Sequence, residues 1–251
     1  MTKKMISKKT AEEAAQTMLD LMFPRRCPVC DRPVRPFGKQ ICMECEERWI
    51  PLSPSKEPLC CRCGKPLPDW GQEYCEDCRQ KSHDFVRGCA VFRYRDVSGA
   101  IFRFKYEGRA EYASYFGSKM VERFVQEFDP SCVDALIPIP LSKEKLRKRG
   151  YNQAHLLAKE LGKKTGILVR NDLLERRQDT QALKKVSGKE RRRYLEKAFI
   201  VSGDDVESKV FMLVDDIYTT GATMDACAEL LLAKGAQSVF FITLAIGEGE
   251  G

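Results

Sequence analysis

The sequence predicts an α/β protein in which a parallel sheet is flanked by helices and is preceded by a small cysteine-rich module. Short apolar runs alternate with helical patterns through the last two thirds of the chain, which is typical of a parallel sheet covered on both faces. Eight of the 12 cysteines fall into four Cys-x-x-Cys pairs between residues 27 and 78. The 251 residues suffice for one domain of ordinary size plus such a module.

The N-terminal residues 1–26 are basic and helix-prone, and we expect them to form a helical lead. Polar residues interrupt its apolar positions (Glu12, Glu13, Gln16 and Asp20), so the segment lacks the core of a signal peptide. No stretch approaches the ~18 apolar residues that a membrane span needs. We therefore expect a cytoplasmic protein that does not bind a membrane.

Residues 27–82 are rich in Cys, Pro and Gly, and a metal is expected to replace a hydrophobic core there. Each Cys-x-x-Cys pair of the first half recurs 33 residues later, which indicates an internal duplication. Paired knuckles at these separations are typical of tetrahedral zinc sites with four cysteine ligands. We predict two structural zinc ions, and the spacing leaves open whether each repeat closes its own site or the knuckles interleave. The predicted ligands are Cys27, Cys30, Cys42, Cys45, Cys60, Cys63, Cys75 and Cys78.

The remaining cysteines and the histidine behind the last knuckle are given no metal role. Cys61 is a spare thiol, and Cys89, Cys132 and Cys227 lie in apolar surroundings and are predicted core residues. His83 is excluded as a ligand because eight cysteines already complete two sites. Disulfides are not expected in a reducing cytosol. Eight thiolates and two Zn²⁺ would lower the formal charge from +7 to about +3, which weakens charge as an argument for nucleic-acid binding.

Residues 83–251 carry the alternating pattern and form the predicted α/β domain. Apolar runs predict strands at 90–94, 133–139, 210–214 and 239–246. Apolar stripes at helical spacing predict helices at 101–106 and 112–128, a helix that includes 154–161, and one that follows Gly221 and stops at Gly235. Ligands of such sheets bind beyond the carboxyl ends of the strands.

The segment 210–223 predicts the class of ligand. Two adjacent carboxylates follow its apolar run, and a turn rich in hydroxyl groups leads into the next helix. Free backbone N–H groups and the helix dipole would face an anion there, and the glycine would allow close approach. Carboxylates suit ribose hydroxyls or a magnesium ion. Although an ordinary capped βα turn is the alternative, we predict a site for a phosphorylated ribose, formed by Asp215, Asp216, Thr219, Thr220, Gly221, Ala222 and Thr223.

Two basic segments flank the predicted site. The first, 138–150, includes Lys143 and Arg149, and the second, 176–197, includes Arg177. Charge runs are usually solvated surface. Beside a phosphate site, however, cations on a closing loop could neutralise a departing pyrophosphate. His155, in the helix after the first segment, is expected to be exposed.

This ordered series of segments resembles the ComF-type proteins of the phosphoribosyltransferase superfamily. The resemblance rests on the double zinc ribbon and on HDFVRG (83–88), FKYEG (104–108), IPIPL (137–141), RGYNQA (149–154) and the segment 214–223. It implies a type I phosphoribosyltransferase fold and a site for 5-phosphoribosyl-1-pyrophosphate (PRPP) with Mg²⁺. It also implies that 140–150 is the pyrophosphate loop and that 176–195 is the flexible loop.

The resemblance leaves more than one function open. In the first, a PRPP-binding protein acts in natural competence, where it handles incoming single-stranded DNA in the cytoplasm, with a competence helicase or another DNA-uptake protein as partner. Tyr94, Tyr106 and Tyr151 would suit base stacking. The alternative is an active phosphoribosyltransferase of nucleotide metabolism, with an unknown amine or base acceptor, no direct DNA role, and Asp215 and Asp216 as catalytic residues. Purine-salvage relatives carry an aspartate base where this chain has Thr219, which disfavours guanine or hypoxanthine as acceptor. A regulatory PRPP sensor with a zinc-dependent interaction module is a third hypothesis.

Overall fold

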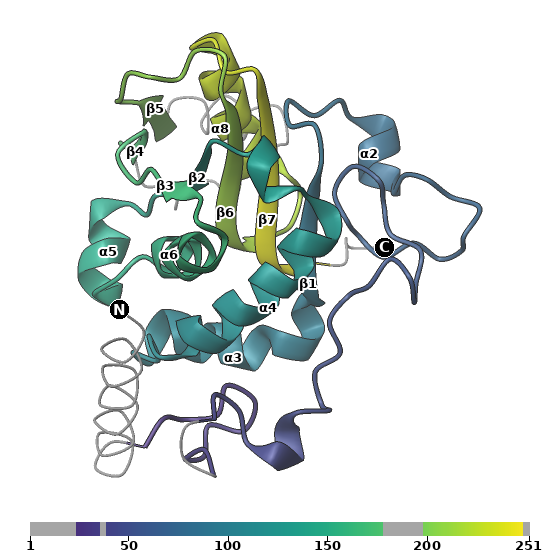
Figure 1. Cartoon of the computed structure of the whole chain (residues 1–251), viewed down its shortest axis with the longest axis vertical. Coiled ribbons are helices and arrows are strands. Elements are labelled where there is room, and N and C mark those ends of the chain that lie inside the picture. Colours follow the sequence, from purple (N-terminus) through teal and green to yellow (C-terminus); the bar gives the residue numbers. More distant parts are fainter. Residues whose placement is uncertain (1–23, 36–38, 178–197, 248–251) are drawn as a thin grey trace, which may run out of the picture. The chain divides into compact units, whose positions relative to one another are not determined.

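A computed structural model describes residues 24–35, 39–177 and 198–247 (Figure 1). The chain forms two compact units, Met1–Ile50 and Pro51–Gly251. Most of the expected helical lead and most of the flexible loop lie outside the described residues. Within the described ranges, no helix combines the length and the apolar character that crossing a membrane requires.

The cysteine repeats share one backbone pattern, which confirms the duplication. In the first repeat the Cys27 N–H donates to Arg32 O, and in the second the Cys60 N–H donates to Lys65 O. Isolated β-bridges join Arg26 to Pro33 and, at the same offset, Leu59 to Pro66. Each second knuckle begins a short helix, which is the 3₁₀ helix η1 (Met43–Cys45) in the first repeat and α2 (Glu76–Gln80) in the second.

The second unit is built on a five-stranded parallel sheet in the order β1-β7-β6-β2-β3. Its central strands are nearly continuous apolar runs because helices cover both faces. A separate antiparallel pair consists of β4 (Leu174–Arg176) and β5 (Phe199–Val201). The sheet strands are β1 (Gly88–Arg93), β2 (Ala135–Pro138), β3 (Leu168–Val169), β6 (Val210–Tyr218) and β7 (Ser238–Ile246).

Helices α4 and α6 pack against each other and against the sheet, with α3 beside β1 (Figure 1). Their buried aromatic side chains, such as Phe104 and Phe116, fill this layer. Helix α8 packs against β7 and β5, and its apolar side chains share a core with Phe211 and Leu213 of β6 and with the second cysteine repeat. The helices of this unit after α2 are α3 (Tyr94–Tyr106), α4 (Tyr112–Glu127), η2 (Pro130–Cys132), α5 (Lys143–Arg149), α6 (Gln153–Thr165) and α8 (Ala222–Ala233).

The predicted strands and helices are present, but five details were wrong. Tyr94, expected at the end of a strand, is the first residue of α3, which begins before the helix predicted at 101–106. Strand β6 does not end before the acidic pair; it continues through it to Tyr218 because it stays paired with β7 as far as Ile246. Part of the first basic segment, expected as a loop, is α5. Cys132, expected in the core, is exposed on η2. The side chain of His155 is half-buried rather than exposed.

Candidate functional site

The sheet order defines where a ligand should bind. Strands β2 and β6 are neighbours, β3 lies beyond β2, and β7 and β1 lie beyond β6. The chain therefore reverses its winding direction between β2 and β6, and ligands of open α/β sheets bind at the carboxyl ends of strands at such a switch point. The segments that leave these two strands are the first basic segment and the turn 219–223.

The turn 219–223, called the phosphate turn below after the ligand group that the sequence predicts for it, presents the amino end of α8. Thr219 and Thr220 are exposed, and the first helical bond runs from the Asp225 N–H to Gly221 O. The N–H groups of the first turn have no acceptor inside a helix, and no side chain caps this end of α8. Backbone donors and the positive end of the helix dipole thus lie together, as an anion requires.

Gly221 is needed for two reasons. Its φ of +81° lies in the left-handed region, which residues with a Cβ rarely adopt. A Cβ there would also lie 2.6 Å from Tyr218 Oη and 3.2 Å from His83 Cε1. From the sequence, Gly221 was predicted to make room for a ligand. In the structure it also makes room for two side chains of the protein, those of Tyr218 and His83.

The acidic pair lies near the end of β6, and its two members have different surroundings. Successive strand residues point to opposite faces of a sheet. Asp216 is buried, and its Oδ2 lies 2.8 Å from Lys105 Nζ on α3. Asp215 is half-buried and accepts a hydrogen bond from the Asp216 N–H at 2.8 Å. One carboxylate is thus held by an internal ion pair, and the other is the more accessible.

The pKa of Asp215 lies well above that of an ordinary aspartate. Burial and the negative charge of Asp216 raise its pKa to about 7, against the opposing effects of Lys105 and Arg176. A group that titrates near neutrality can accept a proton or a hydrogen bond, and a nearby cation would favour its ionised form. Burial together with the charge of Asp215 also raises the pKa of Cys227 on α8, so that this thiol is unreactive, in agreement with its predicted place in the core.

Lys143 and Arg149 lie at opposite ends of α5. Ser142 caps the helix by accepting from the Lys145 N–H, and Gly150 ends it in the left-handed conformation. The side chain of Lys143 is exposed in the first turn. Arg149 donates to Gln153 Oε1 at 2.9 Å and to Tyr106 Oη at 3.0 Å, with its guanidinium 4.8 Å from the centre of the Tyr106 ring.

The residues after α5 anchor the carboxyl end of α3. Tyr151 Oη and Gln153 Nε2 both donate to Phe104 O, at 2.5 and 3.3 Å. Asn152 Nδ2 donates to Ile139 O at 3.0 Å, which joins the same segment to the end of β2. Lys105 follows Phe104 directly, so these bonds place the lysine that pairs with the acidic pair.

The segment 176–195, predicted to be the flexible loop, begins at the end of β4, and β5, the antiparallel partner of β4, follows it; residues 178–197 lie outside the described ranges. Arg177, which was predicted to contact the pyrophosphate, is exposed, and its backbone N–H donates to Ala198 O at 2.8 Å. Its neighbour Arg176 lies with its guanidinium 5.1 Å from the centre of the Phe199 ring and lowers the pKa of Asp215. Of these two arginines, Arg176 is the one whose charge acts on the acidic pair.

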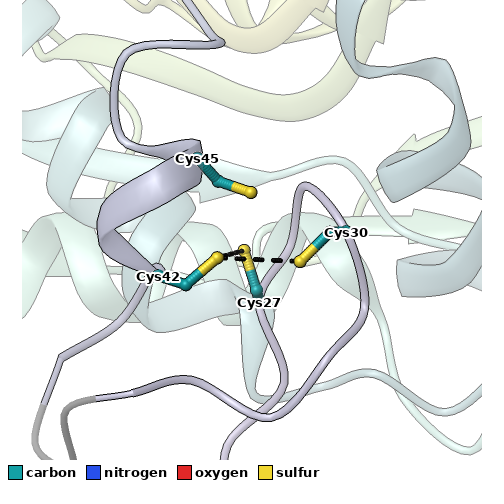
Figure 2. Close-up of side chains that lie close together, drawn as sticks. All are labelled: Cys27, Cys30, Cys42 and Cys45. Atoms are coloured by element: carbon teal, nitrogen blue, oxygen red, sulfur yellow. Dashed lines mark hydrogen bonds between the residues drawn. The ribbon is translucent and has the colours of Figure 1, made fainter.

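Both cysteine clusters fit zinc, and each repeat closes its own cluster. Figure 2 shows the cluster of the first repeat. Within each cluster the four sulfur atoms lie within 4.8 Å of one another. A tetrahedral zinc with bonds of about 2.3 Å places its sulfurs about 3.8 Å apart. The Cys30–Cys42 and Cys63–Cys75 sulfur pairs, both at 3.6 Å, come close to this value. Each repeat therefore supplies all four ligands of its own zinc site, and the interleaved arrangement is excluded. His83 belongs to neither set of ligands, as predicted.

Sequence reasoning missed three residues of the site. Lys105 was noticed only as part of a resemblance, Arg176 only as part of a charge run, and His83 was set aside. Each of them has a partner more than 30 residues away along the chain: Asp216 for Lys105, Asp215 for Arg176 and Asp225 for His83. The order of residues along the chain carries no signal for such pairs.

Comparison with known families matches both parts of the chain. The family model of the double zinc ribbon domain matches residues 18–79, and that of the phosphoribosyl transferase domain matches residues 146–250. These matches, the parallel sheet and the two four-cysteine clusters confirm the predicted fold class.

Among curated proteins, the chain is 33% identical over 209 residues to competence protein ComFC of Bacillus subtilis, covering 82% of this chain and 84% of that protein. It is 35% identical over 108 residues to competence protein F of Haemophilus influenzae, covering 42% and 47%. It is 27% identical over 217 residues to the DNA utilization protein YhgH of Escherichia coli K12, covering 85% and 86%. Among solved structures, a purine phosphoribosyltransferase from Pyrococcus horikoshii aligns with a TM-score of 0.34 and 15% identity, over 53% of this chain and 70% of that one.

Proposed function

Because the chain belongs to the ComF family of competence proteins, we propose that it is a PRPP-binding protein that acts in natural competence and handles incoming single-stranded DNA in the cytoplasm. Relatives that cover more than four fifths of the chain bear names from competence and from DNA utilization, which supports this context. The observation that carries the ligand assignment is the amino end of α8, which no side chain caps and which follows shortly after Asp215 in the chain, at the switch point of the sheet.

In this proposal the phosphate turn binds the 5-phosphate of PRPP through the backbone N–H groups of α8. Asp215 binds the ribose hydroxyls, and Asp216, which Lys105 holds in place, fixes its neighbour through the bond from its own N–H. Lys143 and Arg177, which are exposed, would contact the pyrophosphate. Bound Mg²⁺ would supply charge neutralisation for the pyrophosphate, and the carboxylates are the hard oxygen ligands that it prefers.

A group of exposed aromatic side chains supports the DNA role. Tyr94, Phe102 and Tyr106 are exposed on α3, and the rings of the last two lie 5.1 Å apart. The guanidinium of Arg149 adds a positive charge over Tyr106. Aromatic faces next to cations are the usual means of binding single strands without sequence preference. Tyr151, also predicted to stack, is half-buried and is engaged with Phe104 O, so it offers less.

One observation favours the enzymatic alternative. A general base works best when its pKa lies near the working pH, and the pKa of Asp215 is raised to about 7. Asp215 could then take a proton from an incoming nucleophile while pyrophosphate leaves the ribose carbon. The acceptor in this alternative is an amine or a base of undefined identity.

Titration calorimetry of the zinc-loaded protein with PRPP and Mg²⁺ tests the proposal. We expect binding that is weaker by at least about tenfold in Asp215→Asn and unchanged in Asp204→Asn, a matched control at an exposed carboxylate outside the site. Ribose 5-phosphate should bind more weakly than PRPP because it lacks the pyrophosphate. Wild-type protein that gives no PRPP binding would refute the assignment.

Fluorescence anisotropy with a short labelled single-stranded oligonucleotide tests the second half of the proposal. Affinity should fall steeply between low and high salt and should fall again in Tyr106→Ala. No binding at low salt would exclude direct DNA contact. Release of pyrophosphate in the presence of candidate acceptors decides between the two functions, since only the enzymatic alternative requires it.

A further inference from the structure

His83 lies between the second four-cysteine cluster and the phosphate turn. Its side chain is almost fully buried, with an exposed fraction of 1%. Its Nε2 lies 3.5 Å from Cys78 Sγ, and its Nδ1 lies 3.0 Å from the Asp225 carboxylate. The Phe85 ring stacks on the imidazole at 4.6 Å and restricts its rotation. One rigid ring therefore joins a zinc ligand to the first turn of α8.

Asp225 needs this restraint if the phosphate turn is to bind an anion. A carboxylate in the first turn of a helix is attracted to the free N–H groups there and would compete with a phosphate. In the structure this carboxylate is turned aside, because it accepts from His83 Nδ1 and from the Asp84 N–H at 3.2 Å. Both donors belong to the segment that follows the last knuckle, so the second cluster determines where they lie.

His83 and Tyr218 also pack directly against the backbone of the phosphate turn at Gly221. A Cβ on Gly221 would lie 3.2 Å from His83 Cε1, so a displaced imidazole would move against the turn itself. Tyr218, whose hydroxyl also faces Gly221, is held by a stacked contact with Phe241 at 4.8 Å. The residues under the turn are tightly packed, and a shift at Cys78 has a direct path to the phosphate-binding N–H groups.

We infer that His83 is a positioning residue that couples the second zinc site to the phosphate turn, so that zinc at this site and a phosphorylated ribose at the turn favour each other's binding. The inference rests on the proposed function of the turn. Groups that hydrogen bond to metal ligands commonly orient them and strengthen metal binding. Coupling between two sites is reciprocal by thermodynamic necessity. The phosphorylated ligand must therefore raise the affinity for zinc by the same factor by which zinc raises the affinity for the ligand.

Zinc release to a colorimetric chelator, with and without PRPP and Mg²⁺, measures the coupling on the full-length protein. In wild type the ligand should slow the release of one of the two zinc ions by about fivefold or more and leave the other unchanged. Two substitutions separate the halves of the contact. His83→Asn places an amide near Nδ1 and can keep the bond to Asp225, whereas His83→Gln reaches the position of Nε2 and can keep the contact with Cys78.

Both substitutions should abolish the effect of PRPP on zinc release, because each preserves only one end of the connection. If His83 merely filled space, asparagine or glutamine could substitute for it. Zinc release that still responds to PRPP in either variant would therefore overturn the inference. Zinc content after purification must be two per chain in each variant for the comparison to hold.

Hydrogen exchange of residues 219–226 tests the connection without any phosphorylated ligand. Exchange should be faster in Cys78→Ser than in wild type and unchanged in Cys61→Ser, a matched control at the exposed thiol of the same repeat. Equal exchange in Cys78→Ser and wild type would disprove the connection even if PRPP binds. If PRPP does not bind wild type, the proposed function fails; faster exchange in both His83→Asn and His83→Gln would still support the connection through His83, and exchange as slow as in wild type would disprove it.

Discussion

Replacement of Asp215 by asparagine should stabilise the protein at neutral pH while it weakens ligand binding. The pKa of this carboxyl is raised from 3.8 to about 7, chiefly by burial, so the folded protein binds its proton more tightly than the unfolded chain does. Between pH 4 and pH 7 the free energy of unfolding therefore falls as pH rises, because folding then buries an ionised Asp215 carboxylate in a poorly solvated position. The difference corresponds to an upper limit of about 4 kcal/mol above pH 7, and partial solvation of a half-buried group reduces it to about 2 kcal/mol.

Urea unfolding of wild type and Asp215→Asn, compared in the same buffers from pH 4 to pH 9, measures this effect. The comparison cancels the contributions of zinc and of other titrating groups. The two proteins should be equally stable near pH 4, and the variant should become more stable by about 2 kcal/mol at pH 8. A difference that does not change with pH would refute the raised pKa. Stabilisation together with weaker PRPP binding would identify Asp215 as a residue kept for function at the expense of stability.

Three further predictions follow from individual contacts. Lys105→Met should destabilise the protein by about 3 kcal/mol because it leaves the Asp216 carboxylate buried without its cation, and the double variant with Asp216→Leu should recover most of the loss in a double-mutant cycle. Gly221→Ala should cost about 1–2 kcal/mol in thermal unfolding from its left-handed backbone alone, and Tyr218→Phe should relieve part of any further loss, since Tyr218 Oη lies closest to the added methyl group. Zinc content measured by atomic emission should be two per chain and should fall to one when any single ligand cysteine becomes serine; loss of both ions would contradict local ligation.

The sequence was sufficient for the parts of the fold that depend on local pattern. Buried strands such as β7 are nearly continuous apolar runs, and the cysteine spacing alone indicated the right eight ligands, although not how they group into two clusters. The end of β6 was missed because aspartate is uncommon in strands, and pairing with β7 overrides that preference. Helix α5 was missed because it lacks an apolar stripe, although Ser142 before it and Gly150 after it are ordinary capping signals.

The sequence indicates the residues of the candidate site but not the side-chain contacts that hold them. The phosphate turn and the acidic pair are adjacent in sequence, so a motif reveals them. Their partners are not adjacent. Lys105 reaches Asp216 because Tyr151 and Gln153 hold the carboxyl end of α3, and no feature of the segment around Lys105 announces that contact. Such contacts depend on how the layers pack, which only the folded structure determines.

The two cysteine repeats have one backbone pattern but different structural consequences. The first repeat belongs to its own compact unit, with a small core that includes Val34 and Trp49. The second is part of the larger unit: its Arg62 O accepts from the Gly88 N–H at the start of β1, and Cys60 and Cys63 share a core with α8. Loss of metal from the first repeat should therefore remain local, whereas loss from the second removes support from the sheet and from the phosphate turn together. Duplication supplied two equivalent four-cysteine clusters, and burial against the α/β domain packed one of them into the same core as α8.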